Sequence, residues 1–131
     1  VLFRSTNRDA VESVFCRLKE LYKSVFRQPN LAFMNDYIDL REECFIVKPL
    51  VTESPLMEVD GIKVPTLEKL LVDTQKDVDF DYMQGSEASY LFKMALSQYS
   101  VNYQRLMRYA KRRNIGVKIE ALLNSTKNKF R

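Results

Sequence analysis

Apolar residues recur at helix or strand spacing in separate stretches of the chain, and these spacings predict its first elements. Apolar positions three and four residues apart predict an amphipathic helix over about 8–26. Short apolar runs at 1–3 and 31–34 predict brief strands, and a nearly continuous run at 44–51 predicts a strand covered on both faces. A strand, the long helix and a second strand are typical of a right-handed βαβ unit.

The second half of the chain begins with a hairpin and continues as helices. Residues 57–65 alternate in polarity around Asp60-Gly61, which predicts two antiparallel strands joined by a tight turn. Thr66 is expected to cap a helix that buries Leu67, Leu70, Leu71 and Thr74 and turns Glu68, Lys69, Asp73 and Lys76 toward solvent. Further helices are predicted after caps at Ser86 and Ser100, and a short last one follows.

These elements predict a mixed α/β fold: a small central sheet with an N-terminal βαβ unit and a β-hairpin, followed by a C-terminal helical group. We expect one domain over 1–131, because no long linker or internal repeat divides the chain. Within it, about 1–80 is the mixed core, about 81–124 the helical part and 125–131 a frayed polar tail. The chain begins with Val1 rather than Met, which is typical of a fragment.

Composition removes several classes of function. The 131 residues include no His, so the chain alone supplies no Ser-His-Asp or Cys-His triad and no imidazole metal ligand. Its two cysteines, Cys16 and Cys44, have no metal-binding spacing and are expected to be buried core residues, although the spacing leaves a disulfide open. No apolar run is long enough to span a membrane, and no signal peptide is evident, so we expect a cytoplasmic protein that does not bind membranes.

Charge is distributed unevenly. Residues 100–131 carry nine Lys and Arg and one acidic residue, a net +8, whereas residues 36–60 have a net charge of −5. The basic stretch contains Arg105, Arg108, Lys111, Arg112 and Arg113, interleaved with Tyr99, Tyr103 and Tyr109. Cations with aromatic rings form a candidate contact for a partner or for nucleic acid. The alternative is that the cations complement the helix dipole and the acidic half of the same domain.

The sequence gives only weak evidence for catalytic carboxylates. Glu58, Asp60 and Lys63 resemble the acidic-plus-lysine sets of metal-dependent nucleases, but their spacing differs, and Asp-Gly is also what a tight hairpin turn requires. The acidic run at 73–81 lacks a calcium-loop order and is explained as a solvated helix end. We therefore expect no catalytic residue, metal or cofactor, and an enzyme is the less favoured interpretation.

Two stretches carry a family resemblance. Residues 59–73, VDGIKVPTLEKLLVD, resemble the effector domain of AbiEi-type proteins. Residues 99–113, with the pattern Tyr-Ser-Val-Asn followed by Arg-Leu-x-Arg-Tyr-Ala-x-Arg-Arg, are similar to the helical end of a largely uncharacterised bacterial subgroup of these proteins. These are antitoxins and transcriptional regulators of bacterial abortive-infection toxin–antitoxin systems. Glu68, Lys69 and Asp73 match the helix motif without a known role, and Arg105, Arg108, Arg112 and Arg113 match the basic helical end.

The resemblance implies a non-enzymatic domain that opposes a nucleotidyltransferase-like toxin, directly or through its function. Full-length relatives would add an N-terminal winged helix that binds the promoter, and these 131 residues contain no counterpart of it. Three alternatives remain: a divergent metal-dependent nuclease, a nucleic-acid-binding domain, and a domain that only mediates oligomerisation. The sequence does not set the oligomeric state.

Overall fold

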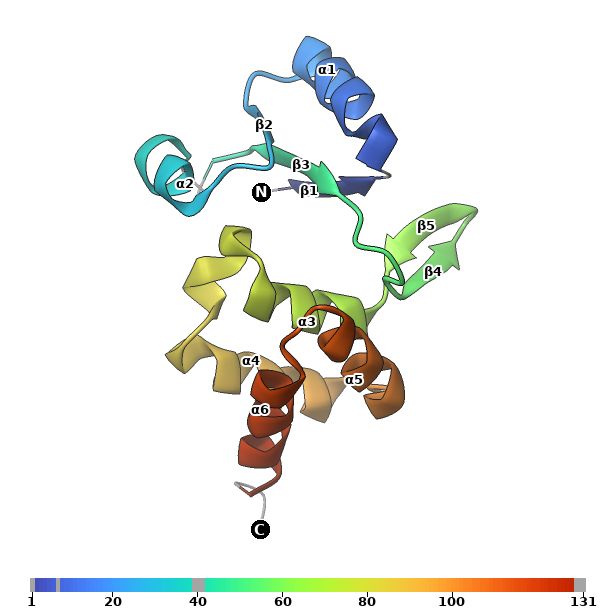
Figure 1. Ribbon diagram of the computed structural model, residues 1–131, viewed down its shortest axis with the longest axis vertical. Coiled ribbons are helices and arrows are strands. Elements are labelled where there is room, and N and C mark those ends of the chain that lie inside the picture. Colours follow the sequence, from blue (N-terminus) through green and yellow to red (C-terminus); the bar gives the residue numbers. More distant parts are fainter. Residues whose placement is uncertain (1, 7, 39–41, 129–131) are drawn as a thin grey trace. The chain divides into compact units, whose positions relative to one another are not determined.

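A computed structural model gives the fold of residues 2–6, 8–38 and 42–128 (Figure 1). The chain forms two compact units, Val1–Thr52 and Glu53–Arg131, which are described separately. The fold is mixed α/β with a C-terminal helical group, as the hydrophobic pattern predicts. The hairpin and the helix after it belong to the second unit, and whether the two units fold as one domain stays a prediction.

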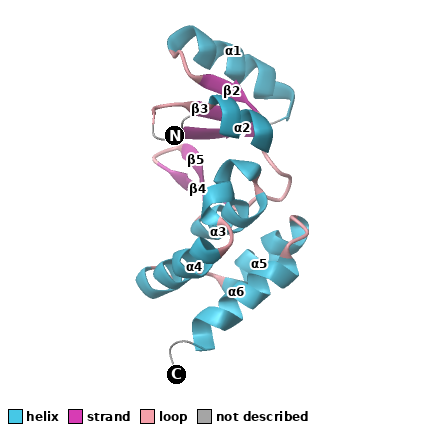
Figure 2. Cartoon of the chain, turned by 90° about the vertical axis from the view of Figure 1, so that its left-hand side faces the viewer, coloured by secondary structure: helices cyan, strands magenta, loops and turns pink. Residues whose placement is uncertain are grey.

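A parallel three-stranded sheet forms the centre of the first unit (Figure 2). Its elements are β1 (Leu2–Thr6), the 3₁₀ turn η1 (Arg8–Ala10), α1 (Val11–Leu21), β2 (Val25–Arg27), α2 (Leu31–Tyr37) and β3 (Phe45–Pro49). The strand order is β1-β3-β2, with Ile46 of β3 in register with Phe3 and Phe26 on its two sides. Val11, Val25 and Val47 form the buried core against which α1 packs.

The predicted strand β3 is confirmed, with Pro49 at its end, but three expectations in this unit are wrong. The first helix ends at Leu21, and Val25 lies in β2, because Tyr22 adopts an extended conformation. Residues 31–37 form a helix rather than a strand, since the Asn30 side chain accepts a hydrogen bond from Phe33 N and caps it. Both cysteines are free, and Cys44 is buried, but Cys16 is exposed.

The second unit begins with the predicted hairpin. Its elements are β4 (Leu56–Val59), β5 (Ile62–Pro65), α3 (Leu67–Lys76), the 3₁₀ segment η2 (Val78–Met83), α4 (Ser86–Gln98), α5 (Tyr103–Arg112) and α6 (Gly116–Asn128). Asp60 and Gly61 both have positive φ, 51° and 78°, the left-handed conformation that joins strands in a tight two-residue turn. The hairpin extends away from the helices of this unit (Figure 1).

Helix boundaries in this unit follow capping residues. Thr66 caps α3 as predicted, because its side chain accepts from Lys69 N. The predicted cap Ser100 is wrong, since Asn102 caps α5 through Arg105 N, and Ser86 is the first residue of α4 rather than its cap. Helix α6 continues to Asn128, so the tail expected at 125–131 is helical in its first part, and 129–131 lie outside the described residues.

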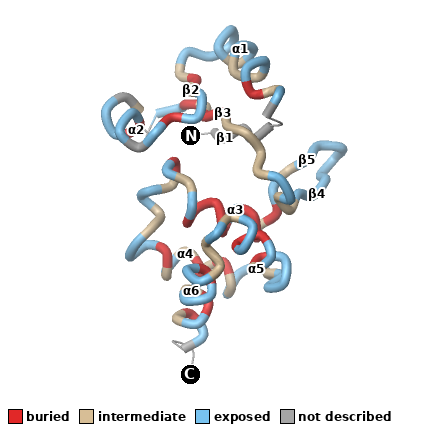
Figure 3. The backbone as a smooth tube through the Cα atoms, viewed as in Figure 1, coloured by how far each residue is buried: buried red, intermediate tan, exposed pale blue. Residues whose placement is uncertain are grey.

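Packing of the four helices places the core of the second unit between them. α3 packs on α5, and α6 packs on α4 and α5. Phe92, Leu106 and Ile119 are fully buried there, and the buried residues follow the inner sides of the helices (Figure 3). Within the described ranges, no helix has the length and apolar character needed to cross a membrane.

Candidate functional site

Helix α3 turns charged residues inward. Glu68, Lys69 and Asp73, the residues of the helix motif, are each about 5% exposed, whereas Leu70 is exposed. The expectation that these three charges face solvent and Leu70 faces the core is therefore wrong. The spacing of the apolar residues predicted the wrong orientation of α3, because α5 places polar partners against the face that carries these three charges.

Five residues of α3 and α5, or at their C-terminal ends, form a buried polar cluster, here called the α3–α5 cluster: Lys69, Asp73, Asp77, Tyr109 and Arg113. The Lys69 ammonium pairs with Asp73 Oδ2, one helical turn away. Asp73 Oδ1 accepts from the Tyr109 hydroxyl at 2.7 Å and from Arg113 NH1 at 2.8 Å. Arg113 NH2 donates to Asp77 Oδ1. Two cations thus face two carboxylates, and the cluster is formally neutral.

Burial of charge is tolerated only when each charge is paired and hydrogen-bonded. The Arg113 side chain is 11% exposed, and those of Lys69 and Asp73 less so. The Lys69 ammonium also lies 5.6 Å from the centre of the Tyr109 ring, which adds a cation–π contact. The cluster therefore holds α3 against α5 through directional contacts. Removal of one charged partner would leave the opposite charge buried without its counter-charge.

The environment of the cluster shifts two pKa values. Burial, with a smaller contribution from the Asp73 carboxylate, raises the pKa of Tyr109 to about 12. Burial by itself would lower the pKa of Arg113, but the hydrogen bond to Asp77 and the contact with Tyr109 raise it above its ordinary value. Tyr109 therefore remains a neutral hydrogen-bond donor, and Arg113 remains charged, throughout the physiological pH range.

Glu68 links the same two helices at the other end of α3. Its Oε1 accepts from the backbone N–H of Asn102 at 3.0 Å and lies 3.6 Å from Arg105 NH1. In a capping box, a glutamate within the helix satisfies the N-cap N–H; here Glu68 does so from a neighbouring helix. Its negative charge also lies near the positive end of the α5 dipole, so it stabilises the start of α5.

The acidic run that follows α3 is only partly solvated. Asp73 and Asp77 bind Arg113, and Asp79 is buried, whereas Asp81 is exposed. The interpretation of 73–81 as a solvated helix end is therefore wrong for the first three carboxylates. Asp73 and Asp77 are four residues apart, as are Tyr109 and Arg113, so each pair lies on one face of its helix. These two matching spacings were the sign of a cluster that the sequence offered.

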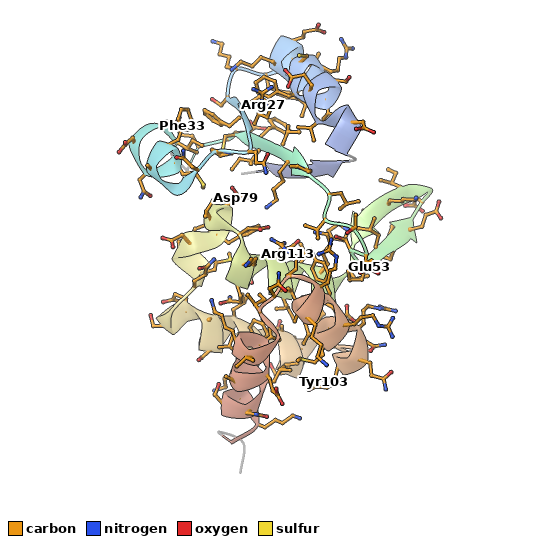
Figure 4. All side chains as sticks on the ribbon, in the orientation of Figure 1. Arg27, Phe33, Glu53, Asp79, Tyr103 and Arg113 are labelled. Carbon is orange, nitrogen blue, oxygen red and sulfur yellow. The ribbon has the colours of Figure 1, made fainter. Side chains whose placement is uncertain are left out.

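The opposite side of α5 carries the cations that remain at the surface. Arg105, Arg108, Lys111 and Arg112 are exposed, whereas Arg113 is held in the cluster (Figure 4). Arg105 lies near Glu68, and Arg112 Nε lies 3.4 Å from Glu53. For Arg108 and Lys111, no ion pair or hydrogen bond to another described side chain occurs. The alternative of internal charge complementation thus holds for Arg113, and for Arg105 and Arg112 in part.

The three interleaved tyrosines divide in the same way. Tyr99 and Tyr103 are exposed, whereas Tyr109 is 2% exposed and belongs to the α3–α5 cluster. The Lys127 ammonium lies 5.2 Å from the centre of the Tyr103 ring. Two tyrosine rings, those of Tyr99 and Tyr103, therefore remain at the surface, and the third does not.

The hairpin residues considered as a nuclease set are all exposed. Glu58 and Lys63 are cross-strand partners in β4 and β5, and Asp60 occupies the turn with positive φ. Opposite charges facing each other across a hairpin stabilise it, which gives this pair an ordinary structural role. Among the residues that the structure describes, no group of three or more Cys, Asp and Glu side chains is arranged to hold a metal ion.

A protein-family model, described as a family of unknown function, DUF6577, matches residues 1–129. The chain belongs to the DUF6577 family. No curated protein and no solved structure matches it. The family model spans both compact units, so the match includes the three-stranded sheet, the hairpin and the helical group.

Within the DUF6577 fold, the sequence-predicted site residues fall into two groups. Glu68, Lys69, Asp73 and Arg113 lie inside and connect α3 to α5. Arg105, Arg108, Lys111 and Arg112 form an exposed strip along α5, here called the α5 basic face. The residues that sequence analysis missed are Asp77 and Tyr109 as members of the cluster, and Asn102 as the helix cap bound by Glu68.

Proposed function

We propose that this chain is the effector domain of a bacterial antitoxin and transcriptional regulator of the AbiEi type, which acts without catalysis in the cytoplasm. In this role it opposes a nucleotidyltransferase-like toxin, and its α5 basic face contacts nucleic acid. The resemblance of residues 59–73 and 99–113 to that group supports the proposal. The DUF6577 family is described as one of unknown function and neither supports nor opposes this role.

The observation that carries the proposal is a difference between the two sides of α5: cations on the inner side are buried and paired with carboxylates, whereas cations on the outer side are exposed. Inside, Lys69 and Arg113 are neutralised by Asp73 and Asp77. Outside, Arg108 and Lys111 project from the helix with no ion pair to a described side chain. Lys and Arg exposed along one helix are suited to phosphate oxygens, and the exposed Tyr99 and Tyr103 can stack on bases.

Antitoxin activity is tested in cells that express the reading frame next to that of this chain, provided that it encodes a nucleotidyltransferase-like protein. Expression of this neighbour should arrest growth, and coexpression of the chain should restore growth. Loss of rescue in Arg108→Glu, but not in the exposed control Lys23→Glu, would connect rescue to the α5 basic face. Growth arrest that the wild-type chain does not relieve would refute the antitoxin role.

Nucleic-acid contact is tested by fluorescence anisotropy with a labelled 20-base-pair DNA at several salt concentrations. Phosphate contacts release counterions, so affinity should fall steeply with salt, and Arg108→Ala should reduce the slope by about one unit. Binding that does not depend on salt would contradict this contact. Cleavage of the DNA with Mg²⁺ or Mn²⁺ that is lost on Glu58→Ala, Asp60→Ala and Lys63→Ala would instead establish the nuclease alternative.

A further inference from the structure

A hollow lies where the end of α5 meets the start of α6, and it is here called the α5–α6 hollow. The two helices pack on each other (Figure 2). Met107, Ile115 and Val117 form the apolar part of its wall. Of the large apolar residues described, Val117 is the most exposed, at 85%. The hollow measures about 690 Å³, within the range of about 300–1,000 Å³ typical of ligand pockets, so it has room for a ligand group.

The turn between the two helices holds an amide side chain at the edge of this hollow. Asn114 has a φ of 62°, and its N–H donates to the Lys111 carbonyl at 3.0 Å. The next N–H, of Ile115, donates to the Ala110 carbonyl at 3.0 Å. These two hydrogen bonds form a Schellman motif at the end of α5, where glycine is the usual left-handed residue. Asparagine serves the same turn and adds a side-chain donor and acceptor to the hollow.

The hollow is continuous with the α5 basic face. Lys111 belongs to both, and Arg108 lies one helical turn before it. Neither cation makes an ion pair or hydrogen bond with another described side chain. Tyr103, Met107 and Lys111 follow one another at intervals of four residues, so they share one face of α5. This face therefore combines the 44% exposed ring of Tyr103, a wall of the hollow and a phosphate-binding cation.

An apolar hollow within a basic surface distinguishes between forms of nucleic acid. The outside of a duplex offers phosphates, sugars and base edges, whereas the flat apolar faces of its bases are hidden in the stack. An unpaired base exposes those faces, which pack on aromatic and apolar side chains. Cations alone suit either form. The exposed side chains of Val117 and Tyr103 favour the unpaired base, because they gain little contact from a duplex.

A carboxylate in the hollow adds a requirement on the ligand. Among the described residues that line the hollow, Glu120 is the one acid, and it lies three residues after Val117 on the same face of α6. It is exposed and makes no ion pair or hydrogen bond with another described side chain. A carboxylate repels phosphate and only accepts hydrogen bonds, so it favours a ligand with a donor. The ribose 2′-hydroxyl is such a donor, next to the base, and DNA lacks it.

We propose that the α5–α6 hollow binds an unpaired base of single-stranded RNA. The base packs on Val117, and the Asn114 amide hydrogen-bonds its edge. Glu120 accepts from the 2′-hydroxyl of the same nucleotide, and Arg108 and Lys111 bind the flanking phosphates. This inference rests on the nucleic-acid contact proposed above and names the kind of nucleic acid that makes it.

Fluorescence anisotropy with a labelled RNA of about ten nucleotides that cannot pair with itself tests the inference. The purified chain should bind this strand about tenfold more tightly than the same strand paired with its complement, because pairing hides the base. It should also prefer the RNA to the DNA strand of the same sequence. Glu120→Ala should remove that preference. The ratio of the two affinities is the readout, since loss of a negative charge raises both.

Two further variants separate the hollow from the cations. Val117→Ser should weaken RNA binding by about fivefold and leave the salt dependence unchanged, because it removes apolar contact but no charge. The matched control Val78→Ser, at an exposed valine outside the hollow, should not change binding. Asn114→Gly keeps the left-handed turn and removes the amide, so RNA binding should weaken while the circular dichroism spectrum stays the same.

The outcomes separate this inference from the proposed function. Salt-dependent binding that is equally tight for the duplex, or that neither Val117→Ser nor Asn114→Gly weakens, would overturn the bound base and leave the nucleic-acid contact of α5 standing. Equal affinity for the RNA and DNA strands would overturn the assignment to RNA. Absence of binding to every strand would overturn both the inference and that contact. Failed growth rescue with intact RNA binding would refute the antitoxin role alone.

Discussion

The two sides of α5 place the same kinds of side chain in opposite environments. On the inner side, Arg113 and Tyr109 meet Asp73 of α3 in a buried, neutral cluster. On the outer side, Arg108 and Lys111 are exposed, with no carboxylate paired to them among the described residues. A stretch of Lys and Arg in a sequence is therefore not one feature, because its inner members hold the fold and its outer members remain available for binding.

The largest effect that would test this comparison is on the shared carboxylate. Asp73→Ala would leave Lys69 and Arg113 buried with one carboxylate fewer, and breaking a buried pair costs about 3–5 kcal/mol. We expect the free energy of unfolding to fall by that amount, measured by urea denaturation followed by circular dichroism. The exposed control Asp81→Ala should change it by less than about 0.5 kcal/mol. Equal, small effects in both variants would show that the inner charges are solvated like the outer ones.

The next effect concerns the neutral donor of the cluster. Tyr109→Phe removes the hydroxyl that donates to Asp73 Oδ1, and a buried hydrogen bond to a charged group contributes about 1.5–3 kcal/mol. We expect a loss of stability in this range at pH 7, smaller than that of Asp73→Ala. A greater loss in Tyr109→Phe than in Asp73→Ala would show that ring packing, rather than charge, dominates the cluster.

Comparison of the wild type with Tyr109→Phe also isolates the contribution of the Tyr109 hydroxyl to the pH dependence of stability. The pKa of Tyr109 in the folded chain, about 12, lies above its ordinary value of 10.0. The folded state therefore favours the protonated phenol, so this contribution to stability is complete below about pH 10 and is lost as the pH rises toward 12. Wild type should lose more stability than Tyr109→Phe between pH 9 and 11, measured by urea midpoints. Parallel losses in the two proteins would contradict the raised pKa.

The comparison also explains which parts of the structure the sequence predicts. The hairpin, β3 and α3 follow from local chemistry: Asp60-Gly61 for the turn, an apolar run for the strand, and Thr66 for the cap. The cluster depends on contacts between residues 36 and 40 positions apart in the chain. The four-residue spacings of Asp73 to Asp77 and of Tyr109 to Arg113 place each pair on one face of its helix, but no local pattern shows that the two faces meet. Helix periodicity assigned Asp73 and Glu68 to solvent because charge is costly to bury, and only α5 makes that burial favourable.

A smaller effect tests how α3 sets the start of α5. Asn102 caps α5 with its side chain, and its own N–H donates to Glu68. Asn102→Ala removes the side-chain cap and keeps the contact with Glu68, so we expect a loss of about 1 kcal/mol in unfolding free energy. Glu68→Gln should cost a similar amount, because the amide oxygen still accepts but the charge near the helix end is lost. A negligible loss in both would indicate that core packing of Leu106 alone fixes α5.

The smallest effect on stability is expected on the outer side of α5. Arg108→Ala removes an exposed cation that pairs with no described side chain, so the unfolding free energy should change by no more than about 0.5 kcal/mol. The same substitution should lower DNA affinity, because each phosphate contact contributes to counterion release. A variant that loses binding without losing stability would separate the two sides of the helix. A variant that loses stability without losing binding would show that Arg108 stabilises the fold rather than binding DNA. Stabilising and binding residues of α5 would then not be separated into its inner and outer faces.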